Sequence, residues 1–242
     1  MSLILISILP VITIMIYLYY RDKYEKEPLS SLFKAFSAGV LSAILTIAAL
    51  MPFGSLAEFK TGLPFVDAVK SAFLWAAIPE EFFKYICLYL FIWKDRNFNE
   101  HYDGIIYAAF VSLGFALFEN ILYVFQMGMD VGISRAIITV PAHALFGVIM
   151  GFYFSLAKFN RSRVKAYLIL SLLLAILAHG IFDFLLMYSS AVSQIDQTMS
   201  MVIFVLFFIF VAYLWKLGFS KIRKHVAASA IFNMGSDKIE YR

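Results

Sequence analysis

Several ionisable side chains lie inside long apolar runs, where charge is unfavourable. Glu80, Glu81 and Lys84 interrupt the run 71–93, and on a helix Lys84 lies one turn from both acids. A charge at mid-membrane costs at least about 2.5 kcal/mol, so such a cluster indicates a functional site. The alternative is a buried ion pair that only holds one helix against its neighbour. Because Lys84 can neutralise only one of the two glutamates, the sequence favours a site.

Three later apolar runs carry further polar groups. Glu119 and Asn120 are adjacent in one run, His143 lies in the next, and His179 and Asp183 stand four residues apart in the third. That last spacing places the imidazole and the carboxylate on one helix face. Taken singly, a histidine or asparagine in a membrane more often hydrogen-bonds a neighbouring helix. Taken together, these groups form a candidate site.

The residue types in this set favour hydrolysis by activated water. A desolvated glutamate beside a second carboxylate can act as a general base toward water. Histidines can stabilise an oxyanion, move a proton or hold a metal ion. The chain has no serine in a Gly-x-Ser-x-Gly setting, and Cys87, its single cysteine, has no histidine in its own run. We therefore expect neither a serine nor a cysteine nucleophile.

The elements that carry these residues are expected to be transmembrane helices. The 242 residues are 62% hydrophobic with a mean hydropathy of +0.84, which excludes a soluble domain of this size. An open sheet cannot satisfy its backbone in lipid, so the prediction is an all-α polytopic bundle. About seven spans are predicted, near residues 3–20, 32–53, 71–93, 104–127, 135–157, 166–188 and 199–217.

The whole chain, 1–242, is predicted to be one membrane domain. Its catalytic helices lie at about 71–188, and a basic cytoplasmic tail covers 216–242. The first run lacks a charged start and a small-residue cleavage site, so we expect a retained span rather than a signal peptide. The first, second and seventh spans carry no interior charge and are interpreted as scaffold. The segment 54–70 is expected to be the longest external connection.

The distribution of basic residues predicts the orientation. Sixteen of the twenty Lys and Arg residues fall in alternate connections and in the tail. Positively charged loops stay in the cytoplasm, so the N-terminus is expected outside and the C-terminus inside. The charges of the tail, and the histidines His101 and His225, are expected to be surface groups. With no soluble basic domain to present a patch, no nucleic-acid partner is expected.

With this orientation the polar groups of four helices fall at a similar depth. A rise of 1.5 Å per residue places Glu80, Glu119, His143 and His179 each about 12–14 Å below the external end of its span. Asp183 falls a turn nearer the surface. Independent structural ion pairs would have no reason to share one depth, so the pattern predicts a single layer in the outer leaflet.

Four motifs in chain order resemble a known family. They are Glu80-Glu81-x-x-Lys84, Phe115-x-x-x-Glu119-Asn120, His143-Ala-x-x-Gly147 and His179-x-x-x-Asp183. Together they resemble the PrsW family of intramembrane proteases, which is distantly related to type II CAAX prenyl proteases and bacteriocin-processing membrane proteins. In the wider superfamily the second motif usually places a histidine four residues after the phenylalanine, where this chain has Glu119.

The resemblance implies an activity, a location and a partner. The expected protein is a multi-pass endopeptidase of a bacterial plasma membrane that makes the first, extracytoplasmic cut in a single-pass anti-sigma factor. That cut leads to release of the sigma factor and to stress-response transcription. By the same resemblance, Glu80 and Glu81 would activate water, and His143 and His179 would complete the site. The candidate catalytic residues are Glu80, Glu81, Lys84, Glu119, Asn120, His143, His179 and Asp183.

Two other classes of protein also use intramembrane acids and histidines. A proton- or cation-coupled transporter would use them as an ion relay, and a non-catalytic assembly factor would use them to hold a partner helix. Transporters often show inverted repeats and broken helices in paired positions. No repeat is evident here, and the charged groups lie on one side of the midplane rather than along a path across it. The sequence therefore favours the protease.

Charge balance bears on a metal cofactor. Four carboxylates share the layer with one lysine, and like charges at short range cannot all stay ionised. Either some are protonated or a cation lies among them. Glu119, His143 and His179 form a common ligand set for catalytic Zn²⁺, with Glu80 as the base acting on bound water and Asp183 orienting His179. The metal-free alternative keeps Glu80 as the base and uses the histidines to stabilise the oxyanion.

Overall fold

The computed structural model describes residues 3–240, with side chains from 3 to 231, and its regular structure there is entirely helical. The helices, in order, are α1 (Leu3–Arg21), α2 (Leu29–Leu50), the 3₁₀ turn η1 (Met51–Phe53), α3 (Gly54–Glu58), α4 (Pro64–Val69), the π-helix η2 (Lys70–Ala77), α5 (Ile78–Ile92), α6 (His101–Met127), α7 (Met129–Ser134), the π-helix η3 (Arg135–Thr139), α8 (Val140–Phe159), α9 (Val164–Val192) and α10 (Gln197–Glu240).

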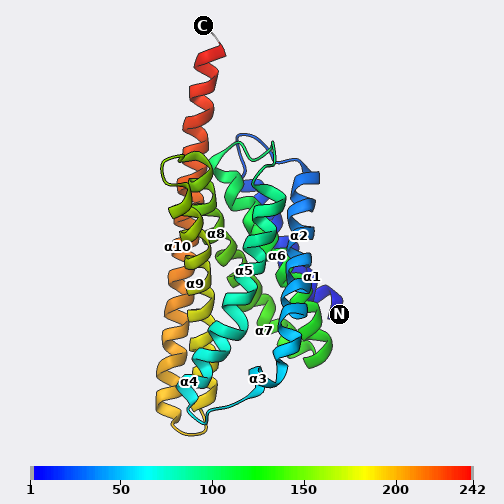
Figure 1. Ribbon diagram of the computed structural model, residues 1–242, viewed down its shortest axis with the longest axis vertical. Helices are drawn as coiled ribbons and strands as arrows, with labels where there is room; N and C mark the ends of the chain where they lie inside the picture. Colours follow the sequence, from blue (N-terminus) through cyan, green and yellow to red (C-terminus); the bar gives the residue numbers. More distant parts are fainter. Residues whose placement is uncertain (1–2, 241–242) are drawn as a thin grey trace.

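These segments form seven long rods, because α4, η2 and α5 are continuous, as are α7, η3 and α8 (Figure 1). Among the described residues, six rods are long and apolar enough to cross a membrane. The remaining rod, Pro64–Ile92, carries Glu80, Glu81 and Lys84 within its apolar stretch. The predicted all-α transmembrane bundle is therefore confirmed.

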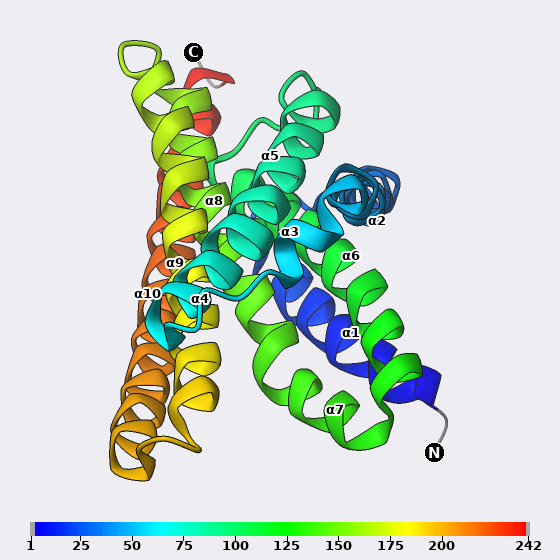
Figure 2. The same ribbon diagram turned by 60° about the horizontal axis from the view of Figure 1, so that its bottom comes forward.

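The core of the bundle is formed by α6 and α8. Most side chains of these two helices are buried, whereas most side chains of α1, α2 and α10 are only partly buried or exposed. Helices α1 and α2 pack on one side of α6, and α9 and α10 pack on the far side of α8. The rod containing α5 lies between α2 and α9 (Figure 2). Three of the four motif-bearing helices, α5, α8 and α9, thus meet beside α6, the fourth.

Close helix packing depends on glycines at the crossings of α6. A Cβ atom on Gly39 of α2 would lie 1.9 Å from the Val111 carbonyl oxygen of α6, and one on Gly114 would lie 2.1 Å from the Phe36 carbonyl oxygen. Small residues let helix backbones approach in this way in membranes, where lipid is as apolar as the side chains. The glycines therefore fix how close α2 comes to the motif on α6.

Three sequence-based boundaries are wrong. The third rod begins at Pro64 rather than near residue 71, so the segment 54–70 is largely helical (α3 and α4). The fifth begins at Met129, which places Arg135 inside a rod instead of at its end. The seventh continues to Glu240 instead of ending near residue 217, and its extension packs on α6 and α8 as far as Ser229.

The extension of α10 also corrects the interpretation of its charges. Lys221 and His225 are buried, with the Lys221 ammonium 3.9 Å from the centre of the Phe152 ring and His225 Nε2 3.0 Å from the Phe152 carbonyl oxygen. His101 is half-buried and stacks on Phe159. The aromatic rings of α8 cover these groups, so neither histidine is a free surface residue. The remaining tail positions, 232–242, lie outside the described side chains.

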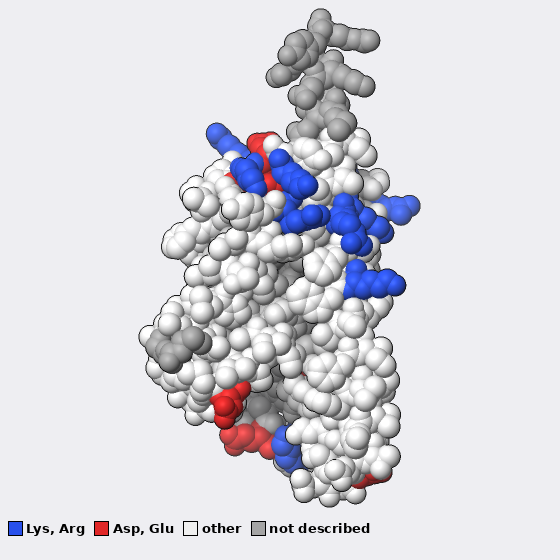
Figure 3. All heavy atoms as spheres, turned by 180° about the vertical axis from the view of Figure 1, so that it is seen from behind, with Lys and Arg blue, Asp and Glu red and all other residues white. Residues whose placement is uncertain are grey.

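Basic residues gather at one end of the bundle. The connections 22–28, 93–100 and 160–163 lie at the end from which α10 projects (Figure 1). Figure 3 shows Lys and Arg side chains clustered over that end and a mostly uncharged surface below it. This clustering agrees with the charge bias read from the sequence.

Candidate active site

Two prolines shape the helices that carry the site. Pro79 and Pro141 lie in the first turn of α5 and of α8, and each follows a π-helix that ends two residues earlier. Proline lacks the N–H that would continue the α-helical ladder, and π turns are frequent at functional sites. Glu80 follows Pro79 directly, and His143 lies two residues after Pro141. The change from π-helical to α-helical geometry thus occurs next to Glu80 and His143, two candidate catalytic residues.

One half of the site is a buried network around Glu81. The Lys84 ammonium donates to Glu81 Oε1 at 2.7 Å, and His179 Nδ1 lies 2.9 Å from the same oxygen. The Glu81 and Lys84 side chains are fully buried. Lys84 Nζ is also 3.6 Å from Glu80 Oε2 and 3.1 Å from His143 Nδ1. A buried ion pair needs such additional polar partners to offset desolvation.

The other half is formed by Glu119, His143 and Arg135. Glu119 Oε2 accepts from the Arg135 guanidinium at 2.7 Å and lies 3.0 Å from His143 Nε2. Arg135 Nε also donates to Asn120 Oδ1 at 3.1 Å. Sequence analysis missed Arg135 as a site residue because it placed that residue at a span end. The sequence did contain a signal for this pair, because Arg135 and Glu119 are opposite charges in two neighbouring apolar runs.

Aromatic rings enclose the imidazoles and the lysine. Phe115 lies under the Lys84 ammonium, 4.0 Å from nitrogen to ring centre, which is a cation–π contact. Phe146 stacks on His179 at 4.8 Å between ring centres. The rings of His143 and His179 are nearly perpendicular, 5.2 Å apart. The rings fix both imidazoles and exclude water from one side of the site.

The structure brings the eight predicted residues into one network. His179 Nε2 lies 3.2 Å from Asp183 Oδ2, which completes the contact expected from their spacing. Asn120 joins only through Arg135, and its amide also donates to the Ser7 carbonyl oxygen at 3.4 Å. Depth was counted from span ends that are partly wrong, yet the predicted convergence of four helices is present.

A possible metal site uses Glu80 as its carboxylate. One ligand atom each from Glu80, His143 and His179 lie within 4.8 Å of one another. Glu80 Oε2 is buried and accepts no hydrogen bond from the described residues, whereas Glu119 Oε2 is already held by Arg135 and His143. Two imidazoles and one carboxylate match the ligands of catalytic zinc sites. The residues present therefore fit such an ion, and Glu80 takes the ligand position that was predicted for Glu119.

A cleft reaches these residues between α2, α3, α5 and α6. Its volume is about 490 Å³, and its lining includes Glu80, Glu119, Trp75 and Tyr123. The Trp75 indole N–H is buried and has no acceptor among the described residues. The cleft thus presents two acids and one open hydrogen-bond donor to whatever enters it.

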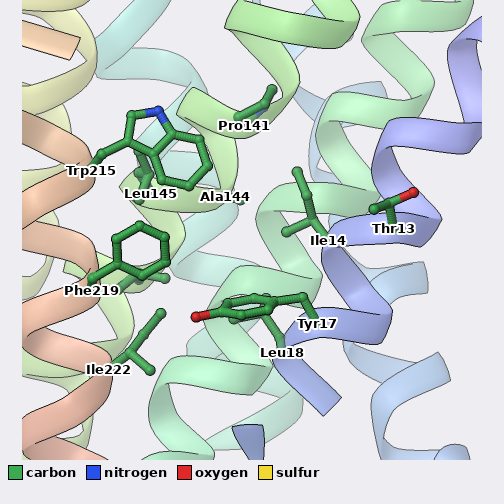
Figure 4. Close-up of a pocket in the computed structure, with 11 residues that line it drawn as sticks. Thr13, Ile14, Tyr17, Leu18, Pro141, Ala144, Leu145, Trp215, Phe219 and Ile222 are labelled. Carbon is green, nitrogen blue, oxygen red and sulfur yellow. The ribbon is translucent and has the colours of Figure 1, made fainter. Parts of the chain in front are cut away.

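A second groove, of about 300 Å³, lies between α1, α8 and α10 (Figure 4). Tyr17 and Trp215 line it together with aliphatic side chains, and it contains no acid, histidine or lysine. Within the described residues it is separate from the acids and imidazoles of the network. It offers an apolar surface to lipid but no groups for chemistry.

Comparison with known proteins gives a consistent result. The model of the family described as PrsW family intramembrane metalloprotease matches residues 27–214. Protease PrsW of Geobacillus kaustophilus is 42% identical over 77% of this chain and 80% of its own length, and that of Bacillus subtilis is 40% identical over 74% and 80%. Protease PrsW of Clostridioides difficile is 33% identical over 93% and 92%.

No solved structure was found that matches the chain. The family match covers α2 to the first half of α10, and therefore every residue of the network described above. A transporter or a non-catalytic assembly factor is not supported by these relatives. The chain belongs to the PrsW family of intramembrane proteases and is a multi-pass membrane protease of bacterial type.

Proposed function

We propose that the chain makes an extracytoplasmic cut in a membrane-anchored protein and that Glu80 is the residue on which water activation depends. The observation that carries this proposal is the Glu80 carboxylate, which lines the cleft, accepts no hydrogen bond at Oε2, and has one oxygen beside both imidazoles. Its Oε2 is 3.6 Å from the Lys84 ammonium, whereas Glu81 and Glu119 each accept a hydrogen bond from a charged side chain at 2.7 Å. A carboxylate that is held only by this longer ion pair, next to two histidines, is available to act on water or on an ion.

We propose further that Glu80, His143 and His179 hold a metal ion. When bound, it would polarise the scissile carbonyl and acidify a water molecule. Glu119 would accept the proton of that water and return it to the leaving amine, while Arg135 holds the carboxylate in place. In the metal-free alternative, Glu80 is itself the base, and the histidines donate to the oxyanion.

The buried groups would position these residues. Both ring nitrogens of His179 face carboxylates, Glu81 at 2.9 Å and Asp183 at 3.2 Å. One of these contacts must therefore be exchanged when the imidazole binds a metal, and the other then fixes the ring. Lys84 neutralises Glu81 and so keeps that carboxylate available as an acceptor.

Replacement of Glu80 by Gln tests both forms of the mechanism. We expect the purified Glu80→Gln variant to keep its helical content and to lose cleavage of a membrane-anchored reporter by about 100-fold or more. If Glu80 is a ligand, the variant also loses bound metal. If Glu80 acts as the base without a metal, the wild-type protein contains no bound metal, and chelation leaves its rate of cleavage unchanged.

Lys60→Gln is the matched control, because Lys60 is exposed in the connection between α3 and α4 and makes none of the contacts of the network. Full cleavage by Glu80→Gln would contradict the assignment of Glu80. Cleavage is scored by immunoblot of the reporter, and metal by elemental analysis of the same preparation.

The proposed substrate is a single-pass anti-sigma factor, cut outside the cytoplasm as the first of two cuts. The resemblance of the four motifs implies this substrate, and the place of the cleft supports an extracytoplasmic cut, because α3, which lines it, lies at the end opposite the clustered basic residues (Figure 1). Co-expression with candidate anti-sigma factors from the same genome should yield a truncated, membrane-bound fragment. Glu80→Gln should leave the anti-sigma factor intact. A cleaved protein of another class would identify a different substrate.

A further inference from the structure

A second group of buried acids lies at the other end of the bundle, away from the active-site network. Asp22 follows α1, and Glu100 and Asp103 stand at the start of α6. One carboxylate oxygen from each of the three lies within 4.8 Å of the others. Their residues are 1%, 1% and 0% exposed. Three acids from two distant segments of the chain thus share one buried space.

Two oxygens in this group are left open by the hydrogen bonds around them. Asp22 Oδ2 accepts from the Glu27 backbone N–H at 3.0 Å, and Asp103 Oδ2 accepts from the Asn99 and Glu100 N–H groups at 2.9 and 2.6 Å. Asp22 Oδ1 and Asp103 Oδ1 are buried and have no hydrogen-bond partner among the described residues. A buried acceptor without a donor costs about 1–3 kcal/mol, so these oxygens indicate a missing ligand.

No neighbouring cation supplies that ligand. Glu27 is a fourth buried acid, whose carboxyl lies within hydrogen-bonding reach of the Asp103 carboxyl and also accepts from the Tyr107 hydroxyl. The Lys26 ammonium donates to the Tyr19 carbonyl oxygen rather than to a carboxylate. Within the described part of the chain, no Lys or Arg nitrogen forms an ion pair with Asp22, Glu27 or Asp103. Concentrated negative charge of this kind requires either a cation or a shared proton.

We propose that Asp22, Glu100 and Asp103 form a binding site for a hard divalent cation, Mg²⁺ or Ca²⁺. Carboxylate oxygens are the preferred ligands of both ions, and an oxygen spread of up to 4.8 Å is comparable to the roughly 4–5 Å diameter of their ligand shells. The ion ties the connection after α1 to the start of α6. It is a structural site, distinct from the network of Glu80, and contains no nitrogen or sulfur ligand.

Cation binding and thermal unfolding of the purified full chain in detergent test the proposal. We expect about millimolar Mg²⁺ or Ca²⁺ to raise the unfolding temperature of the wild type, and calorimetry to show a binding event. Asp22→Asn and Asp103→Asn should each weaken that binding at least about tenfold, while an amide oxygen can still accept the backbone N–H bonds. Titration with each ion separately distinguishes Mg²⁺ from Ca²⁺.

Glu58→Gln is the matched control, since Glu58 is an exposed acid on α3, at the opposite end of the bundle. It should bind the cation like the wild type. Gel filtration and helical content establish that each variant is folded, and two separate aspartates are used in case one variant is not. A wild type that binds neither ion, or two folded aspartate variants that bind as well as the wild type, would overturn the proposal. If low pH raises the unfolding temperature and neither cation does, the carboxyl groups share a proton instead of binding a metal ion.

Discussion

At the scale of single residues, the acids of the site differ in their partners and in their access to the cleft. Glu81 accepts a hydrogen bond from Lys84 and contacts His179, and Glu119 is held in the same way by Arg135 and His143. Glu80 is 13% exposed at its side chain, lines the cleft and has only a 3.6 Å ion pair with Lys84. Adjacent residues in the sequence therefore have different environments, because successive helix positions face different neighbours. This difference could not be deduced from the pair Glu80-Glu81 alone.

Arg135 is expected to position Glu119 through one guanidinium hydrogen bond, while a second bond ties the guanidinium to Asn120. Replacing it with Gln should leave Glu119 with His143 as its remaining partner and lower cleavage about 10- to 100-fold, as loss of an orienting partner typically does. Arg135→Lys should recover only part of the activity, because an ammonium cannot reproduce the fork that reaches both Glu119 and Asn120.

The measurement is the initial rate of reporter cleavage at several substrate concentrations, which separates kcat from KM. A positioning role predicts that kcat falls more than KM rises. Wild-type kinetics in a folded Arg135→Gln variant would show that the ion pair with Glu119 is not needed for catalysis.

At the scale of elements, the apolar runs predicted the helices well and their ends poorly. A run of about 20 apolar residues must become a helix in lipid, so the existence of each helix followed directly from composition. The predicted ends of the helices depended on which charged residues were assumed to lie in water. Arg135 and Lys221 were placed outside the membrane-embedded part, but the structure pairs the first with Glu119 and packs the second on Phe152. Contacts between residues that are far apart in the chain produce no local sequence pattern, so they could not be predicted.

The π-helices show the same limit in a finer form. Pro79 lacks one backbone N–H of the helical ladder, and the π-helix before it covers the eight residues Lys70–Ala77. Nothing in the run 70–77 distinguishes π from α geometry, because the difference is a shift of hydrogen-bond partner by one residue. The residues of the candidate site were predictable because ionisable side chains are rare in membranes. Their pairings required the structure.

The crossing of α2 and α6 gives a test at this scale. We expect Gly39→Ala to destabilise the protein by about 3 kcal/mol or more, because its Cβ would meet the Val111 backbone rather than a movable side chain. Gly54→Ala is the matched control, since a Cβ at Gly54 meets nothing within 4 Å and its backbone is helical. It should leave stability unchanged or raise it by up to about 1 kcal/mol, because alanine restricts the unfolded chain more than glycine does.

Unfolding in detergent, followed by circular dichroism, gives both free energies. The crossing also places α2 against the cleft, so cleavage by Gly39→Ala should fall further than its folded fraction does. Equal stability of the two alanine variants would mean that α2 and α6 do not approach as closely as described.

At the scale of the whole molecule, charge is divided between two ends. The connections rich in Lys and Arg lie together with the projecting part of α10, and the second acid group lies at the start of α6 on this side. The lining of the cleft includes Gly54 and Ala57 of α3, which lies at the opposite end of the bundle (Figure 1). If the basic end is cytoplasmic, as the positive-inside rule requires, the cleft meets substrates from outside. The orientation of the protein in the membrane therefore determines the side from which a substrate reaches the cleft.

Reporter fusions answer that question. We expect a reporter active only in the cytoplasm to give signal when fused after Arg242 and none when fused after Gly128, in the connection between α6 and α7. A reporter active only outside should give the opposite pattern. The physical reason is the bias of sixteen of twenty basic residues toward one set of connections. The inverse result at both positions would put the cleft on the cytoplasmic side, and the proposed extracytoplasmic cut would then be wrong even if Glu80 remains the catalytic acid.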